Sequence, residues 1–229
     1  TVLCSLVATW IRSTVSPLSR YAIRRTRRVA MSPQGIGGDD RCGVWMILQI
    51  LRTAKCHVLF CEDEEVGCVG AKKFTRDSLR PQVNYIVELD RRGSNDAVFY
   101  RCDNPEFEAF ITSSGFETAN GSCSDISYIA PYLETAAVNI SSGYYCEHQR
   151  HEYICLEEMK LNADRVAQMV TQQTEHFEYR EQQDSFFGGE STSILCGILL
   201  LSVKPTSGFH HCRKRQKSSW ERQNLSCSC

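Results

Sequence analysis

Residues 85–90 read Tyr-Ile-Val-Glu-Leu-Asp, a short and mainly apolar run that ends at Asp90. Runs of this length, rich in β-branched and aromatic residues, predict a strand, here at 85–89. Three more strands are predicted at residues 57–61, 97–100 and 136–140. Around them lie five segments whose apolar residues recur at helical spacing: 44–51, 67–74, 105–112, 124–133 and 152–173. Strands that alternate with helices predict an α/β fold built on one central sheet.

Polar residues and proline mark the predicted helix starts. Asp40 and Ser124 are expected to cap the helices that follow them, and Pro105 occupies a favoured first helical position. The last predicted helix, residues 152–173, is amphipathic. Its predicted apolar side consists of Ile154, Leu161, Val166 and Val170.

Composition and charge narrow the classes of protein that this chain can be. It has 229 residues, of which 42% are hydrophobic and 23% are charged, so a wholly disordered or fibrous chain is excluded. The net charge of −1 hides an uneven distribution. Residues 1–38 carry six arginines and no acid, residues 191–229 carry six basic residues and one acid, and residues 39–190 carry 14 basic and 26 acidic residues.

The two basic ends lie outside the predicted fold. The sequence predicts three parts: a basic N-terminal segment at 1–31, an α/β domain at 32–178 and a basic, cysteine-containing, partly disordered tail at 179–229. The N-terminal segment is expected to be disordered, and a chain that begins with Thr1 is expected to be a fragment or a processed product. The thirteen cysteines form no even framework and no CxxC pair, so they are expected to be reduced in a cytoplasmic protein.

Acidic residues follow the predicted strands at their carboxyl ends, where α/β folds bind ligands. Four acids, residues 62–65, follow the strand at 57–61, and Asp90 follows the strand at 85–89. Asp39 and Asp40 lie in a glycine-rich turn, and His148 follows the strand at 136–140. An acidic run by itself is usually a solvated loop. Several carboxylates brought together repel one another unless a cation neutralises them, and pairs of divalent ions bridged by a carboxylate are common in hydrolases.

Five segments in this order resemble the zinc exopeptidase superfamily, the di-zinc aminopeptidases and their relatives. They are GIGGDDRCG at 35–43, DEEVGCVGA at 63–71, VELD at 87–90, GSCSDISYIAP at 121–131 and GYYCEHQRHE at 143–152. The resemblance covers about residues 32–175. It implies a three-layer sandwich with a central mixed, mostly parallel sheet. It also implies a single catalytic domain without a lid domain, since the interval from Asp90 to His148 is too short for one.

The resemblance also implies a role for each matching residue. Asp39 would bridge two metal ions, Glu65 and His148 would bind one of them, and Asp90 would bind the other. Glu64 would be the general base that activates a metal-bound water. His151 is a rival ligand to His148 in the same segment. Three more acids would lie beside the ligands and orient them or their loops: Asp40, Asp125 and Glu152.

These residues predict a metal-dependent hydrolase of peptide bonds, an aminopeptidase or a di- or tripeptidase that acts on short peptides. The expected cofactors are two divalent ions, zinc in the first place, with cobalt or manganese as alternatives. No nucleic acid or membrane partner is expected, and the oligomeric state is left open. The superfamily has a His-x-Asp motif upstream of the bridging aspartate, whereas no histidine precedes Asp39 here. One metal site is therefore expected to be impaired. The alternative is a catalytically impaired member that serves as a binding module or a remnant.

Overall fold

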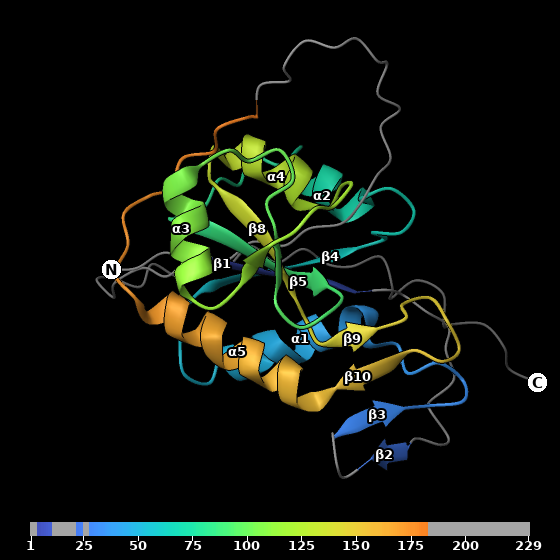
Figure 1. Cartoon of the computed structure of the whole chain (residues 1–229). Helices are drawn as coiled ribbons and strands as arrows, with labels where there is room; N and C mark the ends of the chain where they lie inside the picture. Colours follow the sequence, from blue (N-terminus) through green and yellow to red (C-terminus); the bar gives the residue numbers. More distant parts are fainter. Residues whose placement is uncertain (1–3, 11–21, 25–27, 183–229) are drawn as a thin grey trace, which may run out of the picture.

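A computed structural model describes residues 4–10, 22–24 and 28–182 of the chain. Its main element is a six-stranded sheet in the order β4-β1-β5-β8-β6-β7 (Figure 1). Every neighbouring pair is parallel except β6 and β8, which are antiparallel. The mixed α/β fold predicted from the sequence is confirmed. The strands of this sheet are β1 (Cys4–Trp10), β4 (His57–Glu62), β5 (Tyr85–Arg91), β6 (Asp96–Val98), β7 (Glu117–Thr118) and β8 (Ala137–Ser141).

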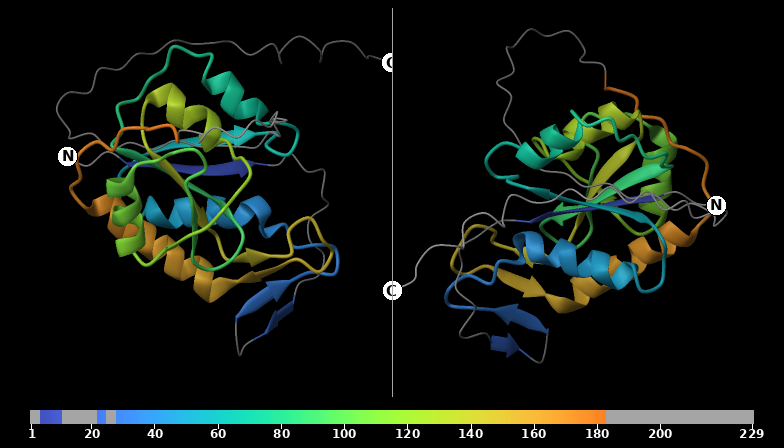
Figure 2. Two further views of the ribbon diagram at one scale, coloured as in Figure 1. Left: turned by 45° about the horizontal axis from the view of Figure 1, so that its top comes forward. Right: turned by 180° about the vertical axis from the view of Figure 1, so that it is seen from behind.

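Helices lie on both sides of this sheet. On one side are α1 (Gly38–Ile50) and α5 (Leu156–Thr171), which contact each other, and α1 also packs on β1 and β5 (Figures 1 and 2). On the other side are α2 (Val69–Phe74) and α4 (Ile126–Leu133), which pack on β4 and on β5 and β8. Helix α3 (Pro105–Ser113) packs beside β7 at the end of the sheet.

A second, smaller sheet lies next to α1 and was not predicted from the sequence. It contains four short antiparallel strands in the order β2-β3-β10-β9 (Figure 1). Their bounds are β2 (Ala22–Arg24), β3 (Val29–Met31), β9 (Tyr144–Tyr145) and β10 (Tyr153–Cys155). Strands this short carry too little periodicity to be recognised, and their pairing joins segments more than 100 residues apart.

The prediction of a disordered N-terminal segment is wrong for Cys4–Trp10. These residues form β1, which pairs in parallel register with β4 on one side and β5 on the other, so that Val7 lies between Leu59 and Glu88. The arginine- and serine-rich sequence around β1 hid a strand of only seven residues. Residues 22–24 and 29–31 are also strands rather than disordered chain. The tail predicted from residue 179 onward lies outside the described residues from 183.

The last helix begins later than predicted. Residues 153–155 form β10 because their backbone groups pair with β3 and β9, and helix α5 starts only at Leu156. Val166 and Val170 are buried as predicted, whereas Leu161 is 48% exposed. The next residue, Asn162, is buried instead, and its amide nitrogen donates to the backbone oxygens of Ser94 and Ser141.

Two predicted helix caps are also wrong, and one helix start is confirmed. Helix α1 begins at Gly38, so Asp40 lies inside its first turn instead of capping it. Helix α4 begins at Ile126, and the hydroxyl of Ser124 donates instead to the buried carboxylate of Glu88. Pro105 does begin α3, where the Oδ1 atom of Asn104 accepts from the backbone N–H of Phe107.

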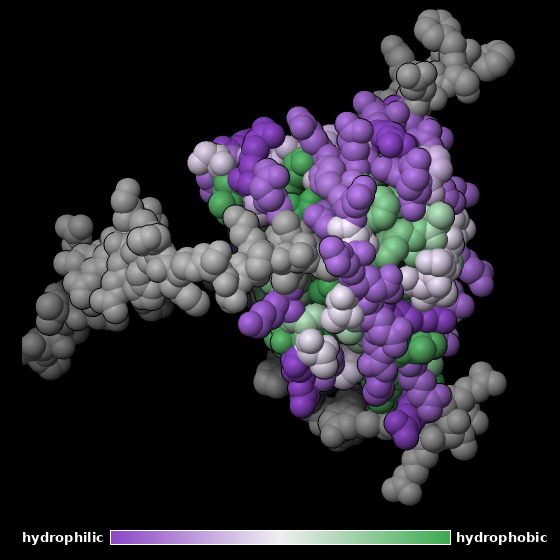
Figure 3. Space-filling view, turned by 90° about the vertical axis from the view of Figure 1, so that its left-hand side faces the viewer, coloured by the Kyte–Doolittle hydropathy of each residue, from purple (hydrophilic) through white to green (hydrophobic). Residues whose placement is uncertain are grey.

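Apolar side chains fill the space between the large sheet and its helices. The side chains of Ile47, Ile86, Phe107 and Val138 are fully buried, and they belong to α1, β5, α3 and β8. The coloured surface visible in Figure 3 is mostly hydrophilic, with smaller apolar groups among the polar side chains. In the part of the chain that the structure describes, no helix combines the length and apolar character that crossing a membrane requires.

The central position of β1 can be tested by proline substitution. Val7→Pro removes a backbone N–H from a strand with partners on both sides, so we expect it to lower the free energy of unfolding by about 3 kcal/mol or more. Denaturant unfolding followed by circular dichroism measures the loss. Val7→Ile keeps the backbone donor and serves as the control. Equal unfolding midpoints for Val7→Pro and the parent would show that β1 is not an integral strand.

Candidate metal centre

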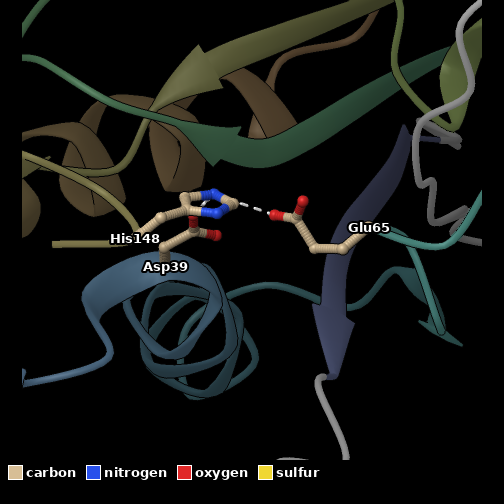
Figure 4. A group of neighbouring side chains, drawn as sticks. All are labelled: Asp39, Glu65 and His148. Atoms are coloured by element: carbon tan, nitrogen blue, oxygen red, sulfur yellow. Dashed lines mark ion pairs between the residues drawn. The ribbon is translucent and has the colours of Figure 1, made fainter.

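Three predicted ligands come together from distant parts of the chain (Figure 4). The Nε2 atom of His148 lies 3.0 Å from Oδ2 of Asp39 and 2.9 Å from Oε1 of Glu65. Asp39 belongs to the first turn of α1, Glu65 follows β4, and His148 follows β9. Burial and the neighbouring charge of Glu64 raise the pKa of Glu65, while His148 opposes that shift. Together they offer one imidazole nitrogen and two carboxylates within ligating distance of one ion.

The loop after β4 brings two acids to this place by a tight turn. The backbone N–H groups of Gly67 and Cys68 both donate to the carbonyl of Glu64, at 2.8 and 3.0 Å. Gly67 has φ of 103°, a left-handed value that favours glycine. The turn leaves Glu64 only 7% exposed, whereas the side chain of Glu65 is 43% exposed. Glu64 is thus enclosed by the protein, whereas its neighbour Glu65 is open to solvent.

The carboxylate of Glu152 holds the backbone of Asp39 in place. Its Oε2 atom accepts from the N–H of Gly37 at 2.7 Å, and its Oε1 atom accepts from the N–H of Asp39 at 2.9 Å. These are N–H groups at the start of α1, which have no partner within the helix. Gly38 between them has no room for a side chain, because an added Cβ would lie 2.8 Å from Cβ of Tyr144. The peptide bond between Asp39 and Asp40 is cis.

A second group of carboxylates shares Asp39 with the first. Ligand atoms of Asp39, Asp40 and Asp90 all lie within 4.8 Å of one another. Burial, followed by the charges of Asp40 and Asp39, raises the pKa of Asp90 well above its usual value. The Oδ1 atom of Asp90 is buried and accepts no hydrogen bond within the described part of the chain. A buried carboxylate oxygen without a donor, beside two further carboxylates, fits a cation.

The backbone of Asp90 is held by two residues that sequence reasoning missed. Asn139 accepts from the N–H of Asp90 at 3.1 Å and donates to its carbonyl at 3.3 Å, and the hydroxyl of Tyr144 donates to the same carbonyl at 3.3 Å. Asn139 is buried in the middle of β8. In the sequence, Asn139 stands among the apolar residues of the predicted strand at 136–140. An amide in such a run needs hydrogen-bond partners, and this signal could have indicated that Asn139 holds a neighbouring backbone.

One hollow of about 300 Å³ is lined by the first group and by Asp39 and Asp90 of the second group. Glu64 lies in its wall together with the ligands of the first group and Asp90. Arg92 also borders the hollow, and its guanidinium contacts the carboxylate of Glu147 at 2.6 Å. The hollow therefore combines two candidate ion sites with a separate carboxylate, Glu64, that belongs to neither group.

Two predicted residues lie away from this hollow. His151, the rival to His148, is exposed in a turn and belongs to neither ligand group. Asp125 is fully buried beneath the site, next to the thiol of Cys61 and near Glu88. Burial, then the charges of Glu88 and Glu64, raise the pKa of Asp125 to about 10, and the Cys61 thiol opposes this as a hydrogen-bond donor. Asp125 is therefore a protonated, neutral group at pH 7.

Comparison with family models gives no match, and comparison with curated proteins gives no significant match. Solved structures do match. A tripeptidase from Staphylococcus aureus superimposes with a TM-score of 0.55 at 13% identity, over 72% of this chain and 79% of that one. The aminopeptidase PepT from Bacillus cereus gives 0.52 at 15% identity, over 71% and 79%. Aminopeptidase I from Clostridium acetobutylicum gives 0.51 at 15%, over 66% and 46%.

The chain shares the fold of these peptidases. The resemblance inferred from the five motifs is thereby confirmed at the level of the fold. The identities of 13 to 15% carry no assignment of individual residues. The roles of the acids and of His148 therefore rest on the geometry of this chain.

The two hydrogen bonds that Glu152 accepts from the start of α1 predict a loss of stability when its carboxylate is removed. Glu152→Ala leaves the N–H groups of Gly37 and Asp39 without their acceptor, so we expect the free energy of unfolding to fall by about 1–3 kcal/mol. Denaturant unfolding measures the change. Glu157→Ala is the matched control, because the side chain of Glu157 is 60% exposed and its ion pair with Arg28 lies at the surface. Equal losses of unfolding free energy in the two variants would show that these hydrogen bonds add no stability.

The buried Asp125 predicts a change in the pH dependence of stability. Its pKa is higher in the folded chain than the value of about 3.9 in an unfolded one, so the folded chain binds more protons and stability falls as pH rises between the two. Asp125→Asn cannot ionise. We expect it to flatten the decline by up to about 1.4 kcal/mol per pH unit between about pH 5 and pH 9. Urea unfolding at several pH values measures this.

Exposed Asp103 offers the matched control, Asp103→Asn. Its stability curve is expected to run parallel to that of the parent. A parallel curve for Asp125→Asn as well would mean that Asp125 is ionised in the folded protein.

Proposed function

We propose that this protein is a metal-dependent hydrolase of peptide bonds, an aminopeptidase or a di- or tripeptidase that acts on short peptides. The observation that carries the proposal is the sharing of Asp39 by two ligand groups, one with Glu65 and His148 and the other with Asp40 and Asp90. A carboxylate common to two ion sites is the arrangement by which two divalent ions act on one substrate. The fold shared with a tripeptidase and two aminopeptidases supports a peptide as the substrate.

The residues suit divalent ions in two places. Asp39, Glu65 and His148 would hold one ion, for which zinc fits the mixture of imidazole and carboxylate. Asp39 and Asp90 would hold the other, while Asp40, Asp125 and Glu152 orient the ligands or their loops. Divalent ions bound here would lower the pKa of a coordinated water and polarise the scissile carbonyl.

Glu64 is the proposed general base. Its side chain lines the hollow beside the ligands and belongs to neither ligand group, and the residue is 7% exposed. It would take the proton from the attacking water and pass it to the amine that leaves. The tight turn, in which the N–H groups of Gly67 and Cys68 donate to the carbonyl of Glu64, fixes the backbone from which its side chain extends.

A single three-layer domain without a lid accompanies this function in our proposal. The chain between Asp90 and His148 contributes strands β6, β7 and β8 and helices α3 and α4 to the large sheet and its cover. The proposed domain spans residues 32–178 together with the N-terminal strand β1, which lies inside its sheet between β4 and β5. We propose a cytoplasmic protein whose partners are peptides rather than nucleic acid or membrane.

The missing imidazole supports a second candidate. The group of Asp39, Asp40 and Asp90 contains no histidine, and none precedes Asp39 in the sequence. A chain with a weakened second site would bind a peptide through one ion without cleaving it. The two candidates differ in turnover, which the next experiment measures.

The test compares Glu64→Gln with the parent on aminoacyl anilides and tripeptides in the presence of zinc. We expect Glu64→Gln to lower kcat by about 10²–10⁴-fold, because an amide cannot accept the proton. Glu62→Gln is the matched control two residues away, since Glu62 is exposed and bonds to Lys73 at 2.7 Å. Turnover by Glu64→Gln at the rate of the parent would exclude Glu64 as the base. A parent without turnover would favour the binding module.

A further inference from the structure

The two ligand groups differ in the kind of atoms that they offer. The first contains an imidazole nitrogen from His148 and carboxylate oxygens from Asp39 and Glu65. The second contains carboxylate oxygens alone, from Asp39, Asp40 and Asp90. Imidazole suits zinc, whereas sites made only of oxygen atoms suit magnesium, calcium and manganese. The chemistry of the ligands therefore differs between two sites that share a residue.

The groups also differ in burial. The side chain of His148 is 51% exposed and that of Glu65 is 43% exposed, so the first group lies at the surface. In the second group Asp40 is only 4% exposed. The Oδ1 atom of Asp90 is buried and has no hydrogen-bond donor within the described residues. This oxygen independently indicates a cation at the second group, because a buried carboxylate without a donor is costly.

The hydrogen bonds that position the second group act on the backbone. Asn139 and Tyr144 bond to the backbone of Asp90, and Glu152 bonds to the backbone of Gly37 and Asp39. These contacts fix where Asp39 and Asp90 lie without adding a nitrogen or sulfur ligand. Three carboxylates also place more negative charge on one ion than the first group does, and a hard cation tolerates this well.

We propose that the two sites hold different ions: zinc at Asp39, Glu65 and His148, and an oxygen-preferring ion of the manganese or magnesium class at Asp39, Asp40 and Asp90. Asp40 is then a metal ligand rather than a residue that orients one. The inference rests on the proposed function in assuming that both groups bind ions. It goes beyond that function in two ways: the two sites hold different ions, and Asp40 becomes a third ligand at the second group.

Competition between manganese and zinc tests the proposal on the intact chain. Metal-free protein is saturated with Mn²⁺ and titrated with Zn²⁺, while free Mn²⁺ is followed by electron paramagnetic resonance. We expect the first equivalent of Zn²⁺ to release one Mn²⁺ per chain. The second Mn²⁺ should leave only at a free Zn²⁺ concentration at least about tenfold higher, because the second group lacks imidazole. Release of both ions over one range, or binding of fewer than two Mn²⁺, would overturn the proposal.

Single substitutions assign each step to a site. His148→Ala is expected to abolish the release at low Zn²⁺ and to leave the later one, whereas Asp40→Asn and Asp90→Asn should abolish the later release alone. Asp103→Asn, at an exposed carboxyl, should keep both. Circular dichroism checks that each variant is folded. Two full release steps in Asp40→Asn would remove Asp40 from the ligand set.

Peptide turnover separates this inference from the proposed function. Two distinct release steps without any turnover by the parent would leave the unequal ion pair standing and contradict the peptidase. Turnover that depends on Glu64, together with release of both ions over one Zn²⁺ range, would support the peptidase and contradict the unequal pair.

Discussion

Mutual repulsion of carboxylates is the constraint on which the site depends. Two ligand groups that share Asp39 bring four acids and one histidine to the carboxyl edge of a parallel sheet, with Glu64 beside them. Such groups separate or take up protons unless a cation or a firm scaffold holds them together. The scaffold here acts on the backbone: Glu152 holds the N–H of Asp39, and Asn139 holds both backbone groups of Asp90. The acids are thus kept close while their oxygens stay available to an ion.

Acids in this fold form two layers with different charge states. The upper layer contains the two ligand groups and Glu64, and all of these residues except Asp40 line the hollow. The lower layer is sealed from solvent and contains Glu88 and Asp125. Burial raises the pKa of both, that of Asp125 to about 10, so Asp125 is protonated at pH 7. Ser124 lies within the lower layer, since its hydroxyl donates to Glu88 and it precedes Asp125. A protonated Asp125 limits the negative charge that the ions above must balance.

Several predictions failed where a backbone group takes a distant partner. Residues 153–155 carry a helical pattern but form β10, because β3 and β9 offer hydrogen bonds to them. The start of α1 moves to Gly38 because Glu152, 113 residues away from Asp39, accepts the first N–H groups. Strand β1 was overlooked because a strand inside a basic, serine-rich segment shows little of its own pattern. Its partners in β4 and β5 are also 52 and 81 residues away in sequence. Local periodicity cannot report such pairings.

The sequence by itself determined the α/β class, four of the ten described strands, the approximate places of the five helices, and the acids at the ends of β4 and β5. It did so because apolar periodicity and the residue types of a site are local properties. The tertiary structure alone decided that His148 lies within 3.0 Å of both Asp39 and Glu65 and that Asp125 is buried below them. It also decided that Asp40, read from the sequence as a cap and an orienting residue, lies with Asp39 and Asp90 in an oxygen-only group. Those outcomes depend on which strands become neighbours, and only the folded sheet sets that order.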